Sequence, residues 1–181
     1  MFERYTEKAR RVIFFARYEA SQFGTPLIEV EHLLLALIRE DRPLFNRAVP
    51  DVNALDAEIR ASLQQDPKIS TTVDLPLSHE AKRVLAYGAE DAERLQSQHI
   101  GTAHLLLGLL REEFAVSEIC RRHSLTLESL RHKLAEQPAG RDTHSIASSL
   151  RKEFSALVDR LAPEVEPATV FLFPSQKDPS E

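Results

Sequence analysis

The sequence predicts an all-α protein of about eight helices with pseudo-two-fold symmetry, followed by one more amphipathic helix. Residues 6–40 and 78–112 align without a gap at a constant offset of 72, and twelve of the thirty-five aligned positions are identical. Apolar residues in both copies recur at steps of three and four, the spacing of one helix face. A repeat at a fixed offset predicts that each copy is one supersecondary unit and that the two units share a core.

The first helix of each copy carries its own start signal. Thr6 and Ser78 are suitable N-caps before the periodic apolar residues. Gly24, Thr25 and Pro26 predict the end of the helix in the first copy. The basic side chains on this helix are expected to be solvated; they are Lys8, Arg10, Arg11 and Arg17.

The second helix of each copy is short and almost wholly apolar. It is expected to begin near Glu31 and to run to Arg39, and Thr102 is a suitable N-cap in the second copy. The runs LLLALI and LLLGLL could also form buried strands, but leucine and alanine favour a helix and β-branched residues are scarce. A helix that is apolar on nearly all sides belongs in the core.

The last helix of the first copy is predicted over about 53–64, and its counterpart carries Leu127, Leu130 and Leu134. The two copies are expected to drift out of register here by about one residue. Residues 65–77 contain two prolines and several Ser and Thr residues, which predicts a linker. One domain over 1–137 would then hold repeat 1 (about 2–64), the linker and repeat 2 (about 78–137).

Residues 138–181 lie beyond the repeat and are predicted to hold a helix and a proline-rich tail. Apolar residues at steps of three and four predict an amphipathic helix over about 144–161. The one apolar run of the tail is ATVFLF, at 168–173. The helix either packs on the repeat domain or, together with the rest of 144–173, docks on a partner or on a second copy of the chain.

Composition excludes several classes of protein. With 28% charged and 43% hydrophobic residues the sequence does not indicate disorder. The net charge of -5 argues against a dedicated nucleic-acid binder, which normally carries a basic surplus. No apolar run approaches the roughly 20 residues of a membrane span. With a single cysteine and a charged N-terminal segment, we expect a cytoplasmic protein that does not enter membranes.

Few side chains indicate chemistry. His32 and His104 occupy equivalent positions, and we interpret each as a histidine near a helix start that satisfies a neighbouring backbone group. Cys120 and His123 form half of a zinc-site pattern whose second half is missing. Cys120 is therefore expected to be a small core side chain. We predict no catalytic residue, no metal and no cofactor.

Four segments carry a resemblance to a known family: FERYTEKARRVI, LSHEAKRVLAYGAEDA, EHLLLALIRE and AHLLLGLLREE. They resemble the N-terminal domain of the bacterial Clp AAA+ unfoldases, the double Clp-N repeat, and most of all the unfoldases that work with a tandem protease. The resemblance covers about residues 1–137. It implies an all-helical pseudo-two-fold bundle that recruits substrates, adaptor proteins or exposed peptides. No GxxxxGK[ST] phosphate loop occurs in the sequence, so we expect a free-standing domain without an ATPase module.

The resemblance also implies a binding site. In some family members an acidic residue in a GTEH motif of each repeat lies in a pocket for phosphorylated arginine. Glu31 matches that residue in the first copy, whereas the second copy has Ala103. A carboxylate can hold a guanidinium through two hydrogen bonds, so we expect the two copies to differ in binding. The candidate residues for binding a peptide or phosphoarginine are Glu31, Val30, His32, Thr102, Ala103 and His104.

The function that follows is a non-catalytic protein- or peptide-binding module, an accessory in protein quality control that is a monomer or a weak homo-oligomer. Its expected partner is a polypeptide: an unfoldase, an adaptor or a substrate. One alternative is a regulatory protein that self-associates through residues 144–173. A more remote alternative is a small hydrolase on a helical bundle, which would need a cluster of ionisable groups facing a pocket.

Overall fold

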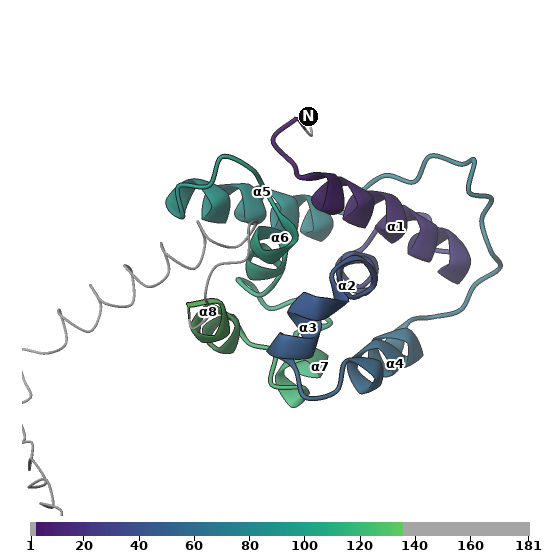
Figure 1. Cartoon of the computed structure of the whole chain (residues 1–181). Helices are drawn as coiled ribbons and strands as arrows, with labels where there is room; N and C mark the ends of the chain where they lie inside the picture. Colours follow the sequence, from purple (N-terminus) through teal and green to yellow (C-terminus); the bar gives the residue numbers. More distant parts are fainter. Residues whose placement is uncertain (1–2, 136–181) are drawn as a thin grey trace, which may run out of the picture.

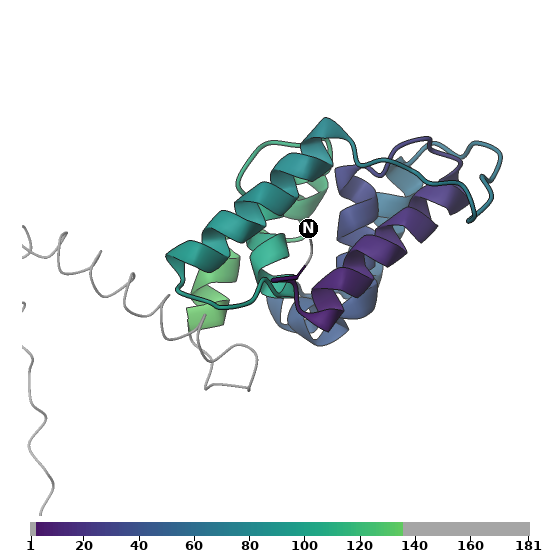
Figure 2. The same ribbon diagram turned by 90° about the horizontal axis from the view of Figure 1, so that it is seen from above.

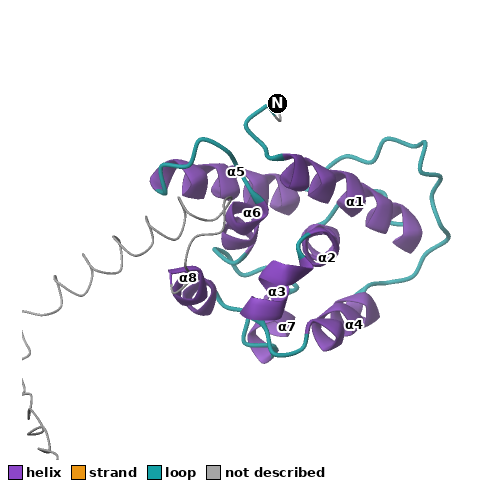
Figure 3. Ribbon diagram, in the orientation of Figure 1, coloured by secondary structure: helices purple, strands orange, loops and turns teal. Residues whose placement is uncertain are grey.

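The computed structural model describes residues 3–135, which form two groups of four α-helices and no strand (Figures 1 and 3). The first group is α1 (Glu7–Phe23), α2 (Val30–Glu40), α3 (Arg42–Ala48) and α4 (Val52–Ser62). The second is α5 (His79–Arg94), α6 (Thr102–Leu109), α7 (Ser117–Arg122) and α8 (Leu127–Ala135). The prediction of an all-α fold of about eight helices is confirmed within these residues. The predicted helix over 144–161 and the tail lie outside them.

Local start and stop signals explain the first helix of each repeat. The Thr6 hydroxyl accepts the Ala9 N–H at 3.2 Å, and the Ser78 hydroxyl accepts the Ala81 N–H at 3.0 Å, so both predicted N-caps are confirmed. Gly24 ends α1 with a φ of 75°, in the left-handed region that glycine adopts at little cost. Gln96 takes the equivalent position after α5 with a φ of 53°.

Two short extended segments are exchanged between the repeats. Tyr5, just before α1, forms a parallel bridge with Ile100, just before α6. Leu77, just before α5, forms the same kind of bridge with Ile28, just before α2. Two backbone hydrogen bonds of 2.8 to 3.0 Å close each bridge. The offset of 72 relates Tyr5 to Leu77 and Ile28 to Ile100. The two bridges, with their hydrogen bonds, are therefore equivalent under the pseudo-two-fold symmetry.

The helix contacts follow the same symmetry. α1 contacts α6 while α2 contacts α5, and α3 contacts α8 while α4 contacts α7. α2 and α6 also contact each other, so the shared core lies between the second helices of the repeats. α1 and α5 lie along the same face of the molecule (Figures 1 and 2).

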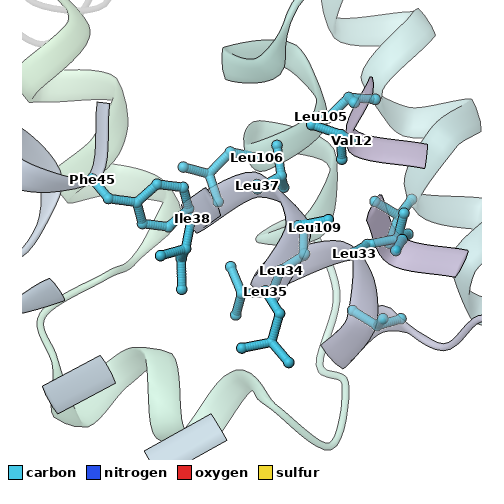
Figure 4. Close-up of a cluster of buried hydrophobic side chains, with 14 of the residues drawn as sticks. Val12, Leu33, Leu34, Leu35, Leu37, Ile38, Phe45, Leu105, Leu106 and Leu109 are labelled. Carbon is cyan, nitrogen blue, oxygen red and sulfur yellow. The ribbon is translucent and has the colours of Figure 1, made fainter. Parts of the chain in front are cut away.

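Leucines from α2 and α6 fill the core. Side chains from these helices meet Val12 of α1 and Phe45 of α3 (Figure 4). All residues of α6, and those of α2 from His32 to Ile38, are buried, which confirms the prediction that the second helices lie in the core. Fully burying one such leucine contributes roughly 2 kcal/mol to folding. The α2 and α6 side chains labelled in the close-up are Ile38 and seven leucines: Leu33, Leu34, Leu35, Leu37, Leu105, Leu106 and Leu109.

The drift between the copies is larger than predicted. α3 begins at residue 42 and α7 at 117, and α4 begins at 52 and α8 at 127, so the offset has grown from 72 to 75. We expected a drift of about one residue. The additional residues lie between the end of α6 and the start of α7, where the chain takes a longer path than between α2 and α3.

Candidate functional site

The six candidate residues fall into two groups near opposite ends of α2. Glu31 lies in the first turn of α2 with Val30 and His32. Thr102 begins α6, and its hydroxyl donates to Oδ2 of Asp41, the residue that ends α2, at 2.6 Å. With a rise of about 1.5 Å per residue, the two ends of α2 are roughly 15 Å apart. The candidate residues therefore do not form one continuous site.

Burial distinguishes Glu31 from the other five candidate residues. Val30, Thr102 and Ala103 are 3%, 7% and 4% exposed, and both histidines are buried as well. Glu31 alone is half-buried, which leaves its carboxylate as the polar group of the six that reaches the surface. Thr102 is the first residue of α6 and Gly101 its N-cap, so the predicted capping role of Thr102 is wrong. Its hydroxyl joins the two repeats instead of capping its own helix.

The paired histidines have the structural role that we predicted. His32 Nδ1 accepts the Glu29 N–H at 3.0 Å, and His104 Nδ1 accepts the Gly101 N–H at 3.0 Å, each at the start of its helix. Because Nδ1 accepts, each neutral ring carries its proton on Nε2. His32 Nε2 donates to the Thr25 hydroxyl at 3.1 Å, whereas His104 Nε2 is buried without a hydrogen-bond partner. Burial lowers the pKa of both imidazoles to about 4.

The environment of Glu31 is acidic. Burial is the main reason why its pKa is raised, and the neighbouring carboxylates of Glu29 and Glu80 raise it further. Glu80 comes from the first turn of α5, which the exchanged bridge at Leu77 brings beside the start of α2. Glu29 is only two positions from Glu31 in the sequence, but nothing near residue 31 indicates that Glu80 lies beside it. Within the described residues Glu31 forms no ion pair.

The matched charged residues elsewhere are paired with each other. Arg11 Nε donates to Glu40 at 2.8 Å, joining α1 to α2, and the equivalent Arg83 and Glu112 join α5 to the segment that follows α6. Arg17 of α1 donates to two backbone carbonyls of the linker at 2.8 and 3.0 Å. The prediction that Arg11 and Arg17 only solvate a helix face is therefore wrong, because each holds together separate parts of the fold.

A buried acid occupies the same place in each repeat. Glu19 of α1 is 3% exposed and accepts two hydrogen bonds from Arg60 of α4, at 2.8 and 3.4 Å. Asp91, its equivalent in α5, is 1% exposed and accepts from Arg94 at 2.9 Å. Burial raises the pKa of Asp91 despite the arginines around it. These acids have cationic partners inside the fold, unlike Glu31.

The cysteine and histidine of the half-pattern for zinc point to different partners. Cys120 is buried in the core, as predicted, and burial raises the pKa of its thiol to about 12. His123 Nε2 lies 2.7 Å from Glu58 Oε2, and this contact ties α4 of one repeat to the end of α7 in the other. Within residues 3–135 no three His, Cys, Asp or Glu side chains come together in a way that could hold a metal ion. None of the helices in that range has the length and apolar character of a membrane span.

Solved structures share the fold of this chain. The N-terminal domain of the chaperone ClpD from Arabidopsis thaliana superposes with a TM-score of 0.60 and 23% identity, covering 86% of this chain and 97% of that one. The N-terminal domain of Hsp104 from Candida albicans superposes with a TM-score of 0.63 and 20% identity, covering 74% and 91%. At these identities the likeness concerns the fold alone.

Sequence relatives are much longer proteins. The ATP-binding subunit ClpA homolog of the ATP-dependent Clp protease from Guillardia theta is 36% identical over 135 residues, which are 72% of this chain and 16% of the relative. The chloroplastic chaperone protein ClpC1 of Oryza sativa subsp. japonica is 38% identical over 115 residues, which are 62% and 12%. The chain thus spans less than a fifth of either relative. The family description "Clp repeat (R) N-terminal domain" matches residues 4–123, and the chain belongs to this family.

Proposed function

We propose that this chain is a protein-binding module that receives a basic side chain of a partner polypeptide at the start of α2. The observation that carries the proposal is the state of Glu31: a half-buried carboxylate with no cationic partner among the described residues. A carboxylate that has lost part of its hydration gains most from a ligand that brings a positive charge and hydrogen-bond donors. An arginine or lysine side chain supplies both.

The neighbouring charges favour an unmodified basic side chain. Glu29 and Glu80 add to the negative potential at Glu31. A guanidinium would be attracted by all three carboxylates, whereas the phosphate of phosphoarginine would be repelled by them. The family resemblance therefore supports the location of the site at Glu31, but the charges around Glu31 do not favour phosphoarginine as its ligand.

The place that the pseudo-two-fold symmetry relates to the Glu31 site, at the start of α6, lacks these groups. At the offset of 72, Glu29, Glu31 and Glu80 correspond to Gly101, Ala103 and Lys8. Ala103 offers no carboxylate, and Lys8 carries the charge of the expected ligand. We therefore infer one basic-side-chain site per chain, at the start of α2.

Membership of the Clp repeat family supports a polypeptide as the ligand. The longer relatives are named as an ATP-binding subunit of a protease and as a chaperone protein. A domain with this fold in a chain that carries no phosphate loop would supply recognition rather than ATP hydrolysis. A place as accessory in protein quality control, next to an unfoldase or an adaptor, fits this role.

Fluorescence anisotropy with labelled peptides tests the site. A peptide with one arginine in a short apolar context is compared with two otherwise identical peptides, one carrying neutral citrulline and one carrying phosphoarginine. We expect the arginine peptide to bind at least about tenfold more tightly than the citrulline peptide, since one charge-assisted hydrogen bond contributes roughly 1.5 kcal/mol or more. Glu31→Gln should remove this difference.

Glu128→Gln is the matched control, because Glu128 is also the second residue of its helix. It should leave the preference for arginine unchanged. Equal affinity of the arginine and citrulline peptides for the wild-type chain would refute the proposed site. Tighter binding of the phosphoarginine peptide would refute the preference for an unmodified side chain.

A further inference from the structure

An exposed aromatic surface lies on α1, away from the Glu31 site. Phe14 is 65% exposed and Tyr18, one turn later, is 39% exposed. Arg17, between them in sequence, donates to the Val73 carbonyl at 2.8 Å, which places the 46% exposed Val73 of the linker beside α1. We call Phe14, Tyr18 and Val73 the aromatic surface.

The aromatic surface belongs to repeat 1 alone. At the offset of 72, Phe14 corresponds to Ala86 and Tyr18 to Glu90. The symmetric framework of the fold therefore does not require aromatic residues here, since α5 forms without them. Large exposed aromatic side chains that packing does not explain are typical of interaction surfaces.

The charge next to the aromatic surface is positive. Arg39 lies over the Phe15 ring at 4.2 Å and near the Tyr18 ring at 5.5 Å. Its one ion pair among the described residues is a long one of 3.9 Å to Glu19, which Arg60 holds more closely at 2.8 Å. Arg10 is exposed and forms no ion pair among the described residues. The neighbouring acids hold other arginines: Glu7 and Glu40 bind Arg11, and Asp74 lies 3.7 Å from Arg17. An occupant with apolar and acidic side chains would complement this surface.

The chain itself contains a segment of that chemistry. Residues 161–176 include the apolar run ATVFLF at 168–173, two glutamates and no basic residue. Thirty-two residues separate α8 from this run. With 144–161 as the predicted helix at about 1.5 Å per residue and the other fourteen residues extended at about 3.4 Å each, they can span up to roughly 75 Å, enough to reach any part of the domain. A tether of this kind gives an effective concentration on the order of a millimolar, so binding within one chain outcompetes binding to a second copy at micromolar protein.

We propose that residues 168–173 bind the aromatic surface of the same chain, with their apolar side chains on Phe14 and Tyr18 and the preceding glutamates towards Arg10 and Arg39. The bound segment would hide the aromatic surface from other apolar ligands. This proposal shares no residue with the Glu31 site, so either can fail without the other.

Paramagnetic relaxation enhancement on the full ¹⁵N-labelled chain tests the contact. A nitroxide spin label is attached through Ser175→Cys; Cys120 stays unlabelled because it is buried, and wild-type chain treated with the label is the control. The amide signals of Phe14 and Tyr18 should lose more than half of their intensity. Ala86 and Glu90, at the matched positions, should keep theirs.

Two further variants make the result specific. Phe171→Ser together with Phe173→Ser should restore the lost intensity at least twofold. Phe14→Ala together with Tyr18→Glu, which gives α1 the residues of α5, should abolish the selective loss around α1 and leave the helix spectrum intact. Equal loss at Ala86 and Phe14, or no loss at either, would overturn the proposal. A loss of the same size in a mixture of spin-labelled ¹⁴N chain with ¹⁵N chain that carries no spin label would also overturn it and assign the surface to a second copy.

Discussion

Gly108→Ala should destabilise the protein, although two simpler arguments predict the opposite. Alanine is the better helix former by about 1 kcal/mol in a helix interior. Repeat 1 also has Ala36 at the matching position, fully buried in α2. In α6, however, a Cβ built on Gly108 would lie 2.6 Å from the Gly88 nitrogen and 2.7 Å from the Val84 oxygen. Both are backbone atoms of α5, so no side-chain rotation can relieve the contact.

The magnitude follows from these distances. Overpacking a core costs typically 1–3 kcal/mol, and a backbone clash that forces two helices apart belongs near the upper end of that range. Subtracting the gain of about 1 kcal/mol in helix propensity leaves a loss of about 2 kcal/mol in the free energy of unfolding. For a domain of this size that corresponds to a fall in Tm of roughly 8 °C. Urea unfolding followed by circular dichroism measures the loss directly.

Gly88→Ala is the matched control within the same helix contact. The closest atom to its new Cβ would be Cδ2 of Leu105 at 3.0 Å, the end of a side chain that can shift. We expect Gly88→Ala to change stability by less than about 1 kcal/mol, because a small strain opposes the gain in propensity. If Gly108→Ala were as stable as the wild type, or more stable, the close approach of α5 and α6 would be refuted.

Three further predictions concern the polar framework. Because His32 and His104 have pKa values of about 4 in the folded state and about 6.5 when unfolded, the unfolded chain binds more protons between these values, and stability is lost as pH falls from 6.5 to 4. Urea unfolding should give about 2 kcal/mol less stability per histidine at pH 5 than at pH 7, and replacing either with asparagine should reduce this slope. Gln96→Gly should raise the free energy of unfolding by about 0.5–1 kcal/mol, because its φ of 53° favours glycine; no rise in urea midpoint would contradict this. Arg60→Ala should lower the free energy of unfolding by about 2 kcal/mol, because it leaves the buried Glu19 without its main partner. This figure is already reduced for the partial exposure of Arg60, and a loss below about 0.5 kcal/mol in thermal unfolding would contradict it.

Local signals in the sequence predicted most of the helical architecture. The N-caps Thr6 and Ser78 and the apolar periodicity depend on neighbours within a few residues, and each is confirmed. The role of His32 and His104 was also predictable, because the group that each satisfies lies three residues away along the chain.

The features that escaped prediction depend on contacts between distant parts of the chain. Glu80 lies beside Glu31 because the repeats exchange their leading segments, and neither residue reveals this exchange by its type. Thr102 is of a residue type that often caps helices, yet its hydroxyl donates a hydrogen bond to Asp41, 61 positions away. Gly108 looks like a helix-weakening residue until the backbone of α5 is placed against it.

The repeat constrains the interior of this protein far more than its surface. The matched buried leucines of α2 and α6 fill the shared core in both copies, and the matched pairs Arg11 with Glu40 and Arg83 with Glu112 tie the first helix of each repeat to the end of its second or the segment beyond. At the binding positions the two symmetry-related places instead differ in charge: the acidic cluster of Glu29, Glu31 and Glu80 at the start of α2 corresponds to Gly101, Ala103 and Lys8 at the start of α6. A cation that is attracted to one end of α2 finds no such attraction at the equivalent place in the other repeat. A symmetric fold is thus expected to bind its polypeptide ligand with a stoichiometry of one per chain, and calorimetric titration with the arginine peptide that gave two equivalent sites would show this reasoning to be wrong.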